Sequence, residues 1–144
     1  MKNELISQDK KNENIIVPIL RGRDLKRYNY TFSNYYLINS NNGLKSKNIE
    51  PINVVLNYPS IFNYFLKYED KLKKRYDQGK HWTNLRNCAY LEDFSKPKII
   101  WGELSDKAKF TYPSFNEKNK KNIKISQFFV FNLNYMVQYQ LPCF

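Results

Sequence analysis

Four cations crowd into one short segment of this 144-residue chain. Arg21, Arg23, Lys26 and Arg27 fall within seven residues, with Asp24 as the one acid among them. Cations so close repel one another unless an anion neutralises them, and the phosphates of a nucleic acid would do so. The arginine guanidinium is a planar fork that can grip two acceptors on a phosphate or on the edge of guanine. The competing interpretation is a solvated loop in which Asp24 pairs with one arginine at the surface.

The rest of the chain carries the same sign of charge. Its 24 Lys and Arg outnumber 13 Asp and Glu, which leaves a formal net charge of +11. This balance is compatible with a polyanionic partner but does not identify one. With 17% aromatic residues, the chain is richer in aromatic side chains than disordered segments are, and its length fits one domain.

No targeting or membrane segment is predicted. Residues 1–14 are polar and lack the apolar stretch of a signal peptide, and we expect them to fray. No run approaches the roughly 20 apolar residues of a membrane helix. Cys88 and Cys143 lie far apart, and neither has metal-ligand spacing, as is typical of reduced thiols. The sequence predicts a cytoplasmic protein with no membrane partner and no bound metal.

A polar turn supplies a second group of candidates for contacting a nucleic acid. Asn41 and Asn42 stand there beside Lys45 and Lys47. Asparagine can read adenine through a bidentate contact, but in a turn it usually serves the turn itself. Both interpretations of this turn stay open at the level of sequence.

No catalytic constellation is visible in the sequence. His81 is the single histidine, and the acidic residues have no accompanying catalytic signature. A glycine-rich phosphate loop is missing as well. We therefore predict no catalytic residue, and we take Arg86 and Lys98 as weaker cationic candidates for binding.

The elements expected to position these residues form a single mixed module of the α+β class. A short apolar run at 15–20 predicts a strand that ends just before the basic segment, where Gly22 frees the backbone to turn. The strongest helix signal covers about 59–76, because Pro59 fits a first helical position and apolar residues recur at helical spacing. A shorter helix is expected at about 81–90. Further strands are predicted at 35–38, 98–101, 107–112 and 127–133.

Several short motifs follow one another along residues 15–112. They are Val17 to Tyr28, Tyr36-Leu37-Ile38, Asn42-Gly43, Pro51-Ile52, Tyr58-Pro59, Leu85-Arg86-Asn87-Cys88 through Phe94, and Lys96 to Trp101. Their order and spacing together resemble the TaqI-like C-terminal specificity domain, the target recognition domain of type II restriction-modification enzymes that methylate adenine in bacterial DNA.

The resemblance implies a module that follows an adenine-N6 methyltransferase domain. Such a module grips double-stranded DNA and reads its sequence, while the methyltransferase domain or subunit flips the base and transfers methyl from S-adenosylmethionine. The catalytic motif of that domain, Asn-Pro-Pro followed by an aromatic residue, occurs nowhere in this chain. We therefore expect no methyl transfer and no cofactor in this chain alone. The expected DNA-binding residues are Arg21, Gly22, Arg23, Asp24, Lys26, Arg27, Tyr28, Asn41, Asn42, Lys45, Lys47, Arg86 and Lys98.

Two departures from the family pattern leave alternatives open. Relatives often carry His before the Asn-Gly of the turn, where this chain has Asn41, and residues 113–144 read as a divergent or truncated tail. One alternative is a non-catalytic interaction subunit or an inactive gene remnant. Another is a general RNA binder, because a basic aromatic chain can stack single-stranded bases.

Overall fold

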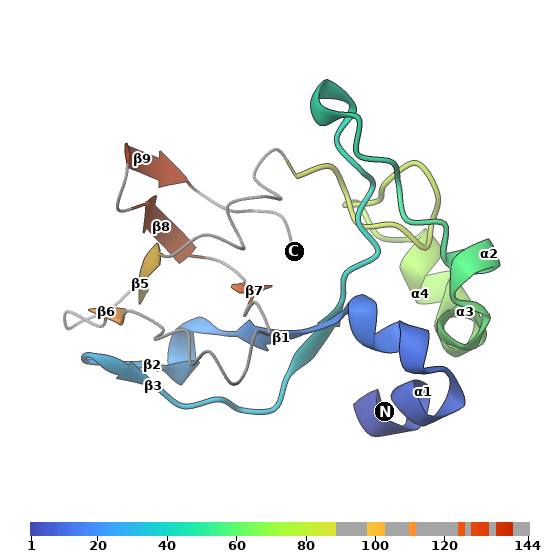
Figure 1. The fold of residues 1–144 in the computed structure, drawn as a ribbon, viewed down its shortest axis with the longest axis horizontal. Coiled ribbons are helices and arrows are strands. Elements are labelled where there is room, and N and C mark those ends of the chain that lie inside the picture. Colours follow the sequence, from blue (N-terminus) through green and yellow to red (C-terminus); the bar gives the residue numbers. More distant parts are fainter. Residues whose placement is uncertain (89–97, 103–109, 112–123, 126–127, 133–134, 140–144) are drawn as a thin grey trace. The chain divides into compact units, whose positions relative to one another are not determined.

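A computed structural model of the chain describes residues 1–88, 98–102, 110–111, 124–125, 128–132 and 135–139. It confirms the α+β class, with short helices and short, mostly antiparallel strands (Figure 1). The chain divides into two compact units. The first comprises Met1–Val17 and Ile38–Ala89, and the second comprises Pro18–Leu37 and Tyr90–Phe144.

The N-terminal segment of the first unit is folded, so the expectation that it frays is wrong. It forms helix α1 (Lys2–Gln8) and the 3-10 helix η1 (Lys10–Asn14). Leu5 is 3% exposed, and Asn12 is fully buried. The Asn12 side-chain amide donates to the Leu5 carbonyl at 2.6 Å and to the Ser60 hydroxyl at 2.7 Å. This buried amide ties the segment to helix α3 (Pro59–Leu66), which the polar composition alone does not reveal.

The single helix predicted over 59–76 is in fact two helices, α3 and α4 (Glu69–Lys73). The break lies at Tyr68, whose φ of −125° and ψ of 17° are not helical. The Tyr68 amide donates to the carbonyl of Phe65 at 2.8 Å, which tightens the chain before α4 begins. Apolar spacing predicts the face that is buried, but it does not detect such a local break.

The shorter helix predicted over 81–90 is absent from its described part, residues 81–88, and positions 89 and 90 lie outside the described residues. The segment forms turns, with an isolated bridge between Gln78 and Leu85. The Arg75 guanidinium donates to the carbonyls of Trp82 at 2.9 Å and Asn84 at 3.3 Å. An arginine side chain therefore occupies carbonyls that a helix would use itself.

Two further elements complete the described part of the first unit. Helix α2 (Val54–Asn57) begins at Asn53, whose side chain accepts from the amide of Leu56 at 3.0 Å. The 3-10 helix η3 (Lys45–Lys47) ends at Asn48, in the left-handed conformation with φ 54°. The buried apolar residues of this unit include Val54, Tyr58, Ile61 and Phe65.

The second unit is built mainly from strands. Residues 16–20 and 98–102 form the strands predicted there, and Phe128–Asn132 forms most of the last one. Of the strand predicted at 107–112, Phe110–Thr111 is described as a strand, and the remaining positions lie outside the described residues. The elements are β1 (Ile16–Leu20), η2 (Gly22–Asp24), β2 (Leu25–Lys26), β3 (Asn29–Tyr30), β4 (Tyr36–Ile38), β5 (Lys98–Gly102), β6 (Phe110–Thr111), β7 (Lys124–Ile125), β8 (Phe128–Asn132) and β9 (Tyr135–Tyr139). The first two residues of β1 and the last residue of β4 belong to the first unit.

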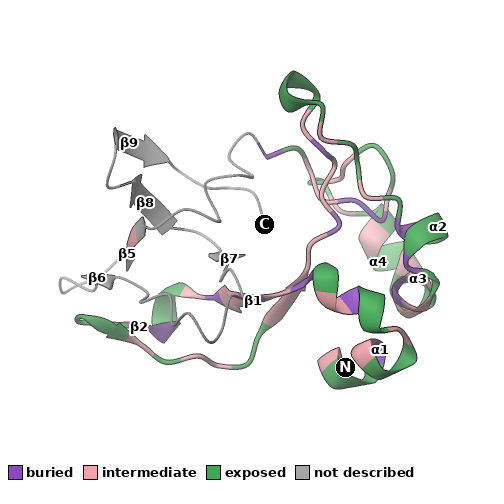
Figure 2. Cartoon of the chain, viewed as in Figure 1, coloured by how far each residue is buried: buried purple, intermediate pink, exposed green. Residues whose placement is uncertain are grey.

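These strands form three sheets, with orders β4-β1-β7, β2-β3 and β6-β5-β8-β9. β1 pairs with β7 in parallel, whereas β5 pairs antiparallel with both β6 and β8. Leu25 at 1% exposure packs with Ile100 at 0%, and Tyr30 adds its ring to this cluster. Figure 2 shows how buried positions alternate along β1. The cluster anchors the β2–β3 hairpin, which includes Lys26 and Arg27 of the basic segment.

Candidate nucleic-acid interface

Asp24 lies at the centre of the basic segment and is only 3% exposed. The Arg21 guanidinium donates to both of its carboxylate oxygens, from Nε at 3.1 Å and from Nη2 at 2.9 Å. The Arg21 amide and the Ser33 hydroxyl add further hydrogen bonds at 2.9 Å and 2.7 Å. Four donors therefore converge on one carboxylate. Chiefly through the Arg21 side chain, they hold the pKa of Asp24 well below its usual range, although burial opposes this.

Arg21 is occupied on a second side as well. Its guanidinium carbon lies 3.8 Å from the centroid of the Tyr35 ring, a cation–π contact. The hydrogen bond to Asp24 also raises the pKa of Arg21. The pairing of Asp24 with one arginine is the contact expected for a solvated loop, but here the carboxylate is buried. Arg21 therefore braces the loop from within.

Three other cations of the segment are exposed to solvent. Arg23 lies in η2, Lys26 ends β2, and Arg27 occupies the turn after it. None of the three forms an ion pair with a carboxylate among the residues that the structure describes. An open hollow of about 480 Å³ lies beside them. The hollow is lined by Arg21, Arg23, Asp24, Lys26, Thr31, Ser33 and Tyr35.

Gly22 opens η2 and is exposed, but its backbone does not use the freedom that sequence reasoning assigned to it. Among the described glycines, Gly43 alone has a positive φ, at 69°. The left-handed region is the one that favours glycine, so the turn at Gly22 does not require it. The missing side chain of Gly22 would still let an anion approach the backbone closely.

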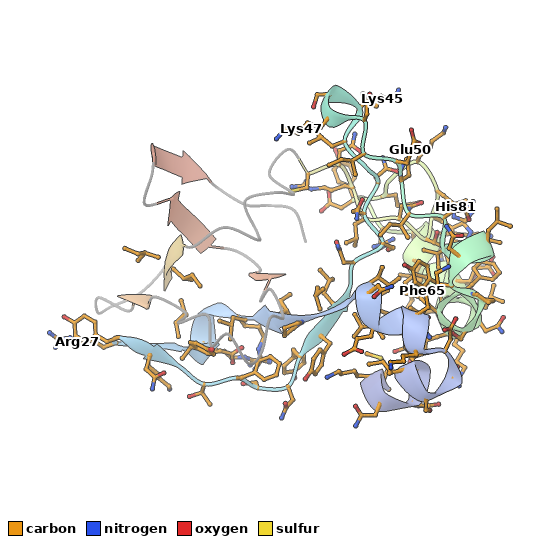
Figure 3. All side chains as sticks on the ribbon, in the orientation of Figure 1. Arg27, Lys45, Lys47, Glu50, Phe65 and His81 are labelled. Atoms are coloured by element: carbon orange, nitrogen blue, oxygen red, sulfur yellow. The ribbon has the colours of Figure 1, made fainter. Side chains whose placement is uncertain are left out.

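The β2–β3 hairpin carries the last two residues of the segment. Leu25 pairs with Tyr30 and Lys26 with Asn29, which leaves Arg27 and Tyr28 as the turn. Tyr28 is 65% exposed and has φ 61°. The Arg27 guanidinium carbon lies 5.2 Å from the Tyr28 ring centroid. Figure 3 shows Arg27 at the outer end of the hairpin, pointing away from the strands.

In the first unit, the asparagines of the polar turn are engaged in holding the chain. The Asn41 side chain accepts from the amide of Gly43 at 3.0 Å, a local turn contact. The Asn42 side-chain oxygen accepts from the amide of Lys80 at 2.8 Å, and its amide donates to the side chain of Asn87. These bonds favour the interpretation in which the asparagines serve the turn.

The lysines of that loop are placed differently. Lys45 and Lys47 are exposed at the end of the loop that η3 forms, as Figure 3 shows. Backbone bonds between Leu44 and Ile49, at 2.8 Å and 3.1 Å, close the base of this loop. The two lysines are thus presented on a short, closed protrusion.

For the remaining two candidates, the structure describes the side chain of Arg86 but only the backbone of Lys98. Arg86 pairs with Asp77 at 3.2 Å and is less available to an anion than expected. Lys98 begins β5 opposite Asn132, and its side chain lies outside the described residues. The segment 21–28 is therefore brought together within the second unit. Lys98 also belongs to the second unit, whereas Arg86 and the candidates of the loop 41–47 lie within the first unit.

Asn84 is a residue that sequence reasoning missed, and it supports the polar turn. It is 4% exposed, and its side-chain amide donates to the carbonyls of Ser40 at 3.3 Å, Asn41 at 3.3 Å and Ile52 at 2.9 Å. We expect Asn84→Ala to lower the free energy of unfolding by about 1–2 kcal/mol, because it leaves buried carbonyls without a donor. Urea denaturation followed by circular dichroism measures this, with the exposed Asn63→Ala as the control. Equal stability of both variants would contradict the assigned role.

Ser33 and Tyr35 were also missed, although both brace the basic segment. They lie in the irregular stretch between β3 and β4, and no spacing rule connects them with Asp24. The run of aromatic and polar residues from Tyr30 to Tyr36 is the one signal that could have drawn attention to them.

The described residues thus define one class of site: an exposed cationic loop and hairpin turn, braced by a partly buried ion pair. No group of three His, Cys, Asp or Glu side chains that could hold a metal is found among the described residues. No helix in the described part of the chain is long and apolar enough to cross a membrane. No protein-family model matches the chain, and no curated protein matches it either.

Proposed function

We propose that this chain is a DNA-binding specificity module of an adenine-N6 restriction-modification methyltransferase. The observation that supports the proposal is that the cations of the segment 21–27 differ in their contacts. Arg21 pairs with Asp24, while Arg23, Lys26 and Arg27 are exposed and form no ion pair with a carboxylate of the described residues. An exposed cationic surface on a braced loop is suited to phosphates.

The division of labour within the segment follows from its geometry. The Arg21–Asp24 pair fixes the loop, which lowers the entropy lost when the loop binds. Arg23 and Lys26 supply charge to the DNA backbone, where most of the affinity arises. Arg27, at the end of the hairpin, is the arginine best placed to reach a base edge, and a bidentate contact with guanine is its preferred one.

The methyltransferase partner and the adenine chemistry rest on the resemblance of Val17 to Tyr28 and the ordered motifs after it. In this proposal S-adenosylmethionine binds to the partner domain or subunit, and this chain supplies recognition. A pull-down of a co-expressed methyltransferase subunit, with and without nuclease, tests the partnership. Capture that disappears with nuclease would show that DNA alone bridges the two.

The salt dependence of DNA binding tests the proposal directly. We expect Arg23→Ala and Lys26→Ala each to make the slope of log K against log salt concentration shallower by about 1, because each removes one phosphate contact. Fluorescence anisotropy of a labelled duplex, titrated from low to physiological salt, measures the slope. Lys10→Ala, an exposed cation of η1, serves as the matched control and should leave the slope unchanged.

Two results would overturn the proposal. Affinity for duplex DNA that does not change with salt would exclude phosphate contacts as its source. Stronger binding of single-stranded RNA than of duplex DNA in direct competition would favour the RNA-binding alternative.

A further inference from the structure

The residue at the hairpin turn is unusual within this chain. Three described residues other than glycine have a positive φ: Tyr28 at 61°, Asn34 at 56° and Asn48 at 54°. Asparagine is common in the left-handed region, because its short side chain tolerates it. A bulky aromatic residue with positive φ is a genuine outlier. The chain therefore uses asparagine at two such positions and tyrosine at the third.

Burial does not explain the choice of tyrosine. Its side chain is 65% exposed, so the ring contributes little to the core, and Figure 2 colours the hairpin turn as exposed. Residues with strained backbone conformations tend to lie at functional sites. An exposed aromatic face on a strained turn is a surface for stacking.

The neighbours of Tyr28 suggest what would stack on it. Arg27 lies against the ring, and Lys26 ends the adjoining strand, so cations flank an aromatic face. A nucleotide presents the complementary pair of features, an anionic phosphate next to a planar base. The combination fits a nucleotide unit better than a free anion or an apolar surface.

The hairpin also holds its turn firmly. Leu25 is buried against Ile100 and Tyr30, and the Thr31 amide donates to the Asp24 carbonyl at 2.8 Å. A rigid two-stranded ribbon is narrow enough to enter a DNA groove. Side chains that wedge between base steps act from such firmly held positions, since the protein must oppose the stacking of the duplex.

We propose that Tyr28 stacks on a base of the bound duplex and partly unstacks the step that it enters, with Lys26 on the adjacent phosphate. This inference rests on the proposed function and deepens it. Stacking would make recognition depend on how easily a base step opens, in addition to the hydrogen bonds that read base edges.

A short mixed-sequence duplex carrying 2-aminopurine tests the inference, because the fluorescence of this base rises when it is unstacked. We expect the wild-type chain to raise the fluorescence and Tyr28→Phe to preserve the rise. Tyr28→Asn should abolish it and weaken binding about tenfold. The salt slope should stay unchanged, since no charge is removed. Asparagine suits the positive φ, so thermal melting should show that Tyr28→Asn remains folded.

The outcomes separate the two proposals. If the chain does not bind duplex DNA, the proposed function fails and the stacking role fails with it. If the wild type binds with a steep salt dependence but Tyr28→Asn matches it in affinity and in fluorescence, the stacking role alone is wrong. Loss of folding in Tyr28→Asn, with Tyr28→Phe folded, would also overturn the inference, because it would make the tyrosine structural.

Discussion

Asp24→Ala is expected to lower the free energy of unfolding by about 2–3 kcal/mol, because four converging donors lose one buried acceptor. The value lies below that for breaking a fully buried pair, since the Arg21 side chain is 24% exposed and can regain water. Urea denaturation followed by circular dichroism measures the change. Asp24→Asn keeps the shape and part of the hydrogen bonding, and it should be less destabilised than Asp24→Ala.

The same residue predicts a pH dependence with a definite sign. The folded pKa of Asp24 lies below its unfolded value, so the ionised carboxylate stabilises the fold above about pH 4. This contribution is lost as the pH falls through the folded pKa. Thermal melting between neutral and acidic pH should therefore show a steeper loss of stability for wild type than for Asp24→Asn. Parallel curves would mean that the Arg21–Asp24 pair does not form in solution.

Arg21→Ala and Arg23→Ala should affect DNA binding differently, although the sequence predicts the same role for both arginines. Arg21→Ala is expected to weaken binding by loosening the loop, with little change in the salt slope, because Arg21 is committed to Asp24 and Tyr35. Arg23→Ala should change the slope itself. A slope change of similar size for both variants would show that Arg21 contacts phosphate directly.

Gly43→Ala is expected to cost about 2–5 kcal/mol of folding stability, the largest single effect proposed for the first unit. A side chain at φ 69° is strained, which costs about 1–2 kcal/mol. The added Cβ would also overlap the Ile49 carbonyl oxygen and lie 2.7 Å from the Glu50 carbonyl carbon. Overpacking of this kind costs about 1–3 kcal/mol.

Gly22→Ala is the matched control for this prediction, because Gly22 is exposed and has no positive φ. Its stability should change little or rise slightly. Hydrogen exchange at the amides of Leu44 and Ile49, which close the loop, should speed up in Gly43→Ala and stay slow in Gly22→Ala. Native protection in Gly43→Ala would contradict the strain argument. Weaker DNA binding in a stably folded Gly22→Ala would support close approach of a phosphate at that position.

The local sequence pattern predicted several secondary-structure elements. The apolar runs at 15–20, 98–101 and 127–133 contain the strands Ile16–Leu20, Lys98–Gly102 and Phe128–Asn132, because β-branched and aromatic residues favour extended backbone. Pro59 begins a helix, as its fixed φ predicts. The break at Tyr68 was not predicted, because hydrophobic spacing continues across it.

By itself, the sequence determined where the charge is concentrated, that an apolar strand precedes it, and that asparagine and glycine shape the turn near residue 42. Only the tertiary structure decided which cations of the segment are available. The sequence does not distinguish which of the four cations pairs with Asp24. The fold buries Asp24 and brings Ser33 and Tyr35 from a distant stretch, so Arg21 becomes the brace while Arg23, Lys26 and Arg27 stay exposed. A buried charge requires a partner, and long-range packing determines which charge is buried.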